Sequence, residues 1–198
     1  MWKAMDFADR IGLSLNYALT LHLEAFVAHP AGSDTEDRHA AYRLLQRFQS
    51  RARHWMERRG CPLAAIWVRE AEGSPKEHVH LAVHIPSSLV NSFGAMLPDW
   101  IGATHPRAFL LKPVKPPGGL KGWFSYMVKG GDDLVHAEYG VRRKDCRDQG
   151  RIVGKRTGMT TAINSKAQTA FKQHHPLRVA SQTENTLRYL LGRPQRVA

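Results

Sequence analysis

The chain has 198 residues, which is enough for one domain with a hydrophobic core plus an extension. Hydrophobic residues make up 42% and charged residues 23%, as is typical of globular proteins, and no apolar run approaches the roughly 18 residues of a membrane-spanning helix. Cys61 and Cys146 lack the spacing of a metal site or a disulfide framework, and the N-terminus lacks a secretory apolar segment. These features predict a cytoplasmic protein with no membrane partner.

The net charge of +12 is unevenly distributed along the chain. Residues 141–198 carry 13 Lys and Arg against 3 Asp and Glu, whereas residues 1–140 carry 16 against 14. A polycation of this density is typical of proteins that bind phosphate backbones, although a solvated tail without a partner has the same composition. We therefore expect a domain over residues 1–135 and a basic, partly helical C-terminal extension over residues 136–198. The basic residues expected to bind nucleic acid are Arg142, Arg143, Lys144, Lys155, Arg156, Lys166 and Lys172.

The first half of the chain alternates between strand-like and helix-like patterns. Residues 13–23 place leucine or tyrosine at every odd position, which predicts a half-buried strand. Residues 36–59 repeat apolar side chains at intervals of three and four, which predicts an amphipathic helix. Residues 63–70 and 78–85 each read as a strand, and the Gly- and Pro-containing turn between them predicts an antiparallel hairpin.

The pattern continues with a helix, a strand and a short helix. Residues 87–101 predict a helix interrupted near Pro98, residues 107–114 a short strand, and residues 120–129 a helix closed by glycines. The element order is typical of an α+β fold with an antiparallel sheet, a split βαβ arrangement of the RRM-like type and flanking helices.

Beyond residue 140 the periodicity weakens. Residues 157–173 and 184–191 are candidate helices, so a helix-turn-helix within residues 157–191 is one possible element. A DNA-binding regulator built on that element is one alternative function of the chain.

Two histidines mark a candidate metal site. Because side chains alternate along a strand, His78 and His80 project from the same face and can reach one cation. A histidine pair with a carboxylate suits a divalent catalytic ion, and Glu70 ends the adjacent strand. We favour Glu70 as the third ligand over Glu72 and Glu77. The alternative is that these histidines only cover a hydrated surface.

A tyrosine and a lysine mark a candidate nucleophile. Tyr126 and Lys129 are three residues apart, so on a helix they share a face, while neighbouring Trp123, Phe124 and Met127 can supply the packing. A phenol attacks poorly at neutral pH unless it loses its proton as it reacts. Lys129 can favour the phenolate or hold the phosphate under attack.

Taken together, His78-Val79-His80 and Tyr126-Met127-Val128-Lys129 resemble the motifs of the HUH endonuclease superfamily, particularly the single-tyrosine initiators of rolling-circle replication. The resemblance covers about residues 10–131. It implies that His78 and His80, with Glu70 as the third ligand, bind Mg²⁺ or Mn²⁺. It also implies that Tyr126, assisted by Lys129, nicks single-stranded DNA within an origin or hairpin. The tyrosine then stays joined to the new 5′ end and leaves a 3′ hydroxyl.

A second alternative to strand cleavage is a non-catalytic nucleic-acid-binding module on an RRM-like sheet. Such modules stack bases on exposed aromatic residues of central strands. In this sequence Tyr17 and Trp67 are the evident candidates for that role.

Overall fold

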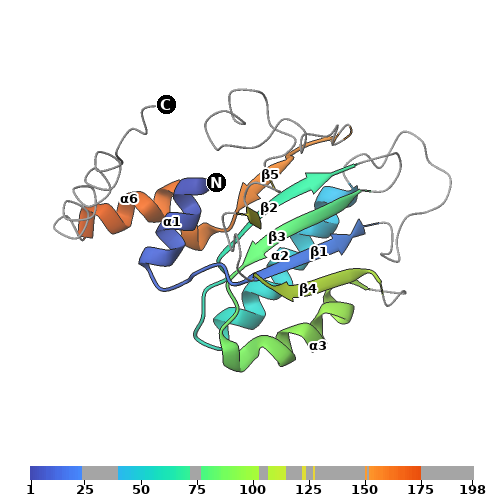
Figure 1. Ribbon diagram of the computed structural model, residues 1–198, viewed down its shortest axis with the longest axis horizontal. Coiled ribbons are helices and arrows are strands. Elements are labelled where there is room, and N and C mark those ends of the chain that lie inside the picture. The colour runs from blue at the N-terminus through green and yellow to red at the C-terminus, as the bar shows by residue number, and fades with distance from the viewer. Residues whose placement is uncertain are drawn as a thin grey trace, which may run out of the picture.

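The computed structural model describes residues 1–23, 40–71, 77–102, 107–114, 122–123, 127, 150 and 152–174. These residues form an α+β fold with one open antiparallel sheet of five strands and four α-helices (Figure 1). The strands are β1 (Tyr17–His22), β2 (Ala65–Glu70), β3 (His78–Val83), β4 (Phe109–Pro113) and β5 (Thr157–Met159). The helices are α1 (Trp2–Arg10), α2 (Ala40–Glu57), α3 (Val90–Ile101) and α6 (Ser165–His174), with short 3₁₀ turns η2 (Ser87–Leu89) and η4 (Thr161–Ile163). Within the described residues, no helix combines the length and the apolar character needed to cross a membrane.

The strand order across the sheet is β4-β1-β3-β2-β5. Every neighbouring pair is antiparallel, so β1 and β2, which flank α2 in the chain, run parallel to each other with β3 between them. The central strand β3 and its neighbour β2 are buried along almost their whole length. The histidine strand is therefore held on both sides by ladders of backbone hydrogen bonds.

One face of the sheet packs against α2 and α3 (Figure 1). We call the hydrophobic core on this face the helix-side core. Trp55 of α2 meets Phe93 and Trp100 of α3 edge to face, with ring centroids 5.9 and 5.7 Å apart. Such contacts between aromatic rings add to the hydrophobic gain from burial. The strand residues on this side are those at odd positions, including Leu19, Leu21, Ala65, Trp67, Val79, Leu81 and Val83.

The opposite face of β2 and β3 packs against α1, η4 and α6, and we call this the site-side core. Helix α1 was not expected from the sequence, yet four of its residues are buried. Phe7 of α1 contacts Phe171 of α6 edge to face at 5.4 Å, and Ile163 of η4 is fully buried between the two helices and the sheet. The strand residues on this side occupy even positions and include Ile66, Val68 and Ala82.

The basic C-terminal segment supplies a strand to the sheet. Residues Thr157–Met159 pair with Ile66–Val68 on the outer edge of β2 (Figure 1). Opposite Trp67 stands Gly158, and an added Cβ there would lie 2.4 Å from the indole ring. Glycine therefore makes room for the tryptophan at this pair. The change in charge near residue 136 does not mark the end of the sheet.

The helix expected over residues 157–173 was wrong in its first turns. Helix α6 begins only at Ser165, because the side chain of Asn164 accepts a hydrogen bond from the Ala167 N–H at 2.9 Å and so caps the helix. The expected helix over residues 184–191, the second helix of the proposed helix-turn-helix, lies outside the described residues.

The expected interruption at Pro98 was also wrong. Helix α3 continues through Pro98 to Ile101, and burial of Leu97, Trp100 and Ile101 holds its last turn against the sheet. The helix ends at Gly102, whose φ of 62° lies in the left-handed region and whose N–H bonds to the Pro98 carbonyl.

Candidate metal centre

Cross-strand register brings the candidate ligands together on the site side of the sheet. Glu70, the last residue of β2, stands directly opposite His78, the first residue of β3. On the other side of β3, His22 of β1 pairs with His78 and Thr20 pairs with His80. Side chains of directly opposite residues on one face are neighbours, so these five residues form a polar cluster.

One carboxylate oxygen of this cluster lies close to both imidazole rings. Glu70 Oε2 lies 3.2 Å from His78 Nε2 and 3.4 Å from His80 Nε2. The three candidate ligand atoms all lie within 4.8 Å of one another. Glu70 is 1% exposed and His80 5%, whereas the His78 side chain is 18% exposed and borders solvent. Glu70 and His80 are thus buried, and His78 is the most exposed of the three.

The separations of Glu70 Oε2 from the two imidazole nitrogens suit a shared cation. Ligands bound at about 2.0–2.2 Å to one ion stand roughly 3.0–3.5 Å apart when they are neighbours in its coordination shell. A buried carboxylate also requires compensation by an opposite charge, which either a protonated histidine or a divalent ion supplies. The Glu70, His78 and His80 side chains can therefore hold a metal ion, as their sequence pattern predicts.

The neighbours of His80 fix its ring. Thr20 Oγ1 lies 3.0 Å from His80 Nδ1, which leaves Nε2 directed at Glu70. Hydrogen bonding at one imidazole nitrogen orients the other for a metal. The Trp123 ring stands nearly perpendicular to the imidazole, with centroids 5.7 Å apart. Sequence reasoning did not assign this role to Thr20, because the partner of each strand residue depends on a long-range register.

A further histidine, His22, lies near the candidate ligands and was not predicted from the sequence. The rings of His22 and His78 are 5.9 Å apart and tilted by 35°. His22 is the last residue of β1 and lies on the same face of the sheet as the three ligands. The alternation of residues 13–23 gives its face, but not its proximity to His78.

An ion pair on the opposite face holds the same hairpin. Arg69 is fully buried and its guanidinium pairs with Glu77. Its Nη1 also donates to the carbonyls of Val153 and Lys155, each at 2.9 Å. Arg69 and Glu77 precede Glu70 and His78 in the chain, so the pair ties together the two strands that carry the ligands. The Glu77 carboxylate is therefore already paired with the Arg69 guanidinium.

The expected nucleophile lies outside the described residues, as do Lys129 and the alternative ligand Glu72. Two neighbours of Tyr126 are described. Trp123 contacts His80, and Met127 is 3% exposed within the site-side core. Trp123 and Met127 thus both lie on the face of the sheet that carries the ligands.

The basic residues expected to bind nucleic acid divide into three groups. Arg142, Arg143 and Lys144 lie outside the described residues. Lys155, Lys166 and Lys172 are exposed. The Arg156 guanidinium instead donates a hydrogen bond of 2.6 Å to the Gly150 carbonyl, so it contributes to local structure.

The aromatic residues considered for base stacking lie on the helix side of the sheet and do not form an exposed stacking surface. Trp67 is 4% exposed within the helix-side core, and Tyr17 packs against that core. Neither residue offers a free ring on the site side, which weakens the RRM-like alternative.

Neither the protein-family models nor the curated proteins compared with this sequence match it. The geometry of the site therefore carries the functional argument.

Proposed function

We propose that this protein is a divalent-metal-dependent endonuclease of the HUH type, which nicks and rejoins single-stranded DNA through a phosphotyrosine at Tyr126. The observation that carries the proposal is the set of candidate ligand atoms from Glu70, His78 and His80, all within 4.8 Å of one another on the paired strands β2 and β3. The strand order β4-β1-β3-β2 adds support, because it is compatible with the split βαβ arrangement that the HUH resemblance implies.

We propose that the ion is Mg²⁺ or Mn²⁺, as the HUH resemblance implies, and that its role is catalytic rather than structural. Three protein ligands leave coordination positions for water and for a phosphate oxygen, as catalytic sites require. When bound, such an ion neutralises the scissile phosphate and polarises its P–O bonds. His78, which is the most exposed ligand, lies where a DNA strand would enter.

The position of Tyr126 in the chain suits attack at this site. Three residues span at most about 11 Å, so Tyr126 stays within that distance of Trp123, which contacts His80. The phenol oxygen would attack phosphorus and displace the 3′ oxygen of the preceding nucleotide. The phenol loses its proton and the leaving oxygen gains one, so the products are a 5′-phosphotyrosine and a 3′ hydroxyl. Because the phosphotyrosine is itself a phosphodiester, attack by a 3′ hydroxyl rejoins the strand.

Lys129 would assist by placing a positive charge near the attacking oxygen. An ammonium favours the phenolate over the phenol and also attracts the phosphate. Exposed Lys112 on β4 adds positive charge on the site face, because it pairs with Ala18, an even-numbered residue of β1.

A covalent-adduct assay tests this function. We expect wild-type protein, Mn²⁺ and a pool of fluorescent single-stranded oligonucleotides to yield a protein–DNA adduct that survives denaturation. Tyr126→Phe should abolish the adduct, whereas the matched control Tyr139→Phe should retain it, and chelation should prevent it in every case. Absence of any adduct across the pool, with DNA binding retained, would reject cleavage in favour of a binding module.

A further inference from the structure

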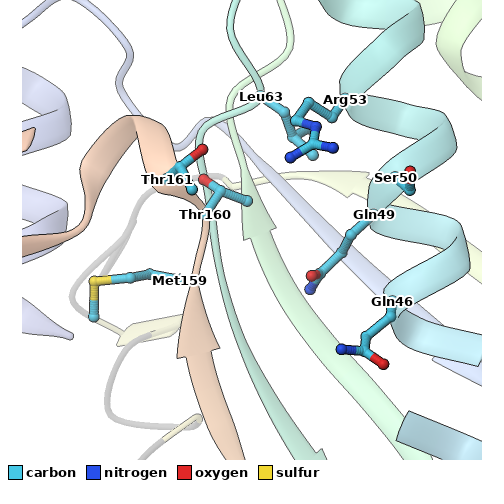
Figure 2. Close-up of a pocket in the computed structure, with 8 residues that line it drawn as sticks. All are labelled: Gln46, Gln49, Ser50, Arg53, Leu63, Met159, Thr160 and Thr161. Carbon is cyan, nitrogen blue, oxygen red and sulfur yellow. The ribbon is translucent and has the colours of Figure 1, made fainter. Parts of the chain in front are cut away.

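A pocket with a mixed polar and apolar lining lies between α2 and the chain at the end of β5, away from the metal ligands (Figure 2). It has a volume of about 250 Å³, and Leu63 and Met159 form its apolar part. Ala65, whose N–H bonds to Thr160 at this cavity, is five residues before Glu70, or about 17 Å along β2. The side chains used below are Gln46, Gln49, Ser50, Arg53, Thr160 and Thr161.

The cavity offers hydrogen-bond donors with unused capacity. Gln49 Nε2 is buried and makes no hydrogen bond within the described part of the chain. In Figure 2 the Gln46 and Gln49 side chains extend from α2 toward β5. A buried donor without a partner is destabilising, so an acceptor placed here would recover that loss. The Thr160 hydroxyl accepts from the Ala65 N–H at 3.0 Å and retains its own proton for donation.

The charge of the lining favours an anion. None of the cavity's described lining residues carries a carboxylate, and Arg53 supplies a cation. The Arg53 side chain is 45% exposed, and its pairing with Glu57 at 4.0 Å is long and solvated, so it is easily exchanged for another partner. Helix α2 carries four arginines and one glutamate, which gives its surroundings a positive potential.

We propose that this cavity binds a phosphate group, and that its source is a backbone phosphodiester of the nucleic-acid strand. Arginine, glutamine, serine and threonine side chains are those that contact phosphate and sugar oxygens in protein–DNA complexes. The cavity would hold the strand at a point separated from the metal centre, and so fix its position. The identity of the strand rests on the proposed function, whereas recognition of phosphate rests on the cavity alone.

Binding of labelled single-stranded oligonucleotides to metal-free protein tests this site. We expect Arg53→Ala to weaken binding several-fold and to lower the slope of log affinity against log salt by about 0.7, the loss of one phosphate contact. Gln49→Glu should weaken binding further, because a carboxylate would face the phosphate. The matched control is Arg47→Ala, an exposed arginine of the same helix outside the cavity. Equal slopes for Arg53→Ala and Arg47→Ala would overturn the proposal.

A second measurement follows the Gln49 side-chain amide by NMR, with thermal melting to verify the fold of each variant. The Gln49 resonances should shift on titration with the oligonucleotide, and in Arg53→Ala the same shift should require several-fold more oligonucleotide. A response to inorganic phosphate at similar saturation would assign the site to free phosphate, and no response to either probe would reject it. Because every sample contains chelator, these results do not depend on strand cleavage, which the Tyr126 adduct assay tests separately.

Discussion

Glu70 and His78 stand directly opposite each other on β2 and β3, and their Oε2 and Nε2 atoms are 3.2 Å apart. His80 reaches the same carboxylate oxygen from two residues further along β3, at 3.4 Å. One buried carboxylate oxygen thus lies close to both imidazoles. Four predictions concern the contacts within this hairpin and with the strands beside it.

The first prediction concerns the carboxylate. Glu70→Gln keeps the side-chain size but removes the negative ligand, so we expect the affinity for Mn²⁺ to fall at least about tenfold. Calorimetric titration of Mn²⁺ measures this change. The matched histidine control is His84→Gln, because His84 lies on the same strand face but bonds to the Ser14 carbonyl at 2.8 Å. Unchanged Mn²⁺ affinity in Glu70→Gln would exclude this carboxylate as a ligand.

The second prediction concerns the ring orientation of His80. Thr20→Val removes the hydroxyl that lies 3.0 Å from Nδ1 while keeping a β-branched side chain suited to β1. Metal affinity should fall about 10–100-fold, as it does when groups that orient a ligand are lost. Thr20→Ser retains the hydroxyl and should bind Mn²⁺ nearly as the wild type does. If Thr20→Ser and Thr20→Val lose affinity equally, the hydroxyl has no orienting role.

The alternation of residues 78–85, with the turn between the second and third strands, was sufficient to predict that Glu70, His78 and His80 lie together. In a hairpin the side-chain period of two and the turn determine which residues share a face, and local sequence carries both. The proximity of Glu70, His78 and His80 is therefore predictable from one short stretch of sequence.

The remaining parts of the site and fold depend on long-range contacts. The pairing of Thr20 with His80 joins strands separated by α2, and no local pattern encodes that register. Strand β5 has three residues, too few to show alternation, and its place follows from the fit of Gly158 against Trp67. The expected helix beginning at residue 157 failed for this reason, since its first residues bond to β2.

The third prediction concerns the ion pair behind the ligands. Arg69→Met leaves the Glu77 carboxylate and two carbonyls without the guanidinium, so the free energy of unfolding should fall by about 3 kcal/mol. Urea denaturation of metal-free protein measures it. Arg53→Met is the control, because that arginine is largely exposed. A loss below about 1 kcal/mol in Arg69→Met would show that this pair does not hold the hairpin.

The fourth prediction concerns the junction between β5 and β2. Gly158→Ala would place a Cβ 2.4 Å from the Trp67 ring, and we expect a destabilisation of about 1–3 kcal/mol from the enforced shift. In Gly94→Ala the nearest atom is Leu111 Cδ2 at 3.9 Å, so this helix substitution should be neutral or stabilising. Thermal melting of both variants provides the comparison. Equal stability of the two would contradict the close packing of Gly158.

The most direct test of the metal centre is anomalous diffraction from crystals soaked in Mn²⁺. We expect one peak about 2.0–2.2 Å from Glu70 Oε2, His78 Nε2 and His80 Nε2, with further positions filled by water. A saturating soak that leaves the three side chains bonded only to one another, without a peak among them, would contradict a catalytic metal at this site.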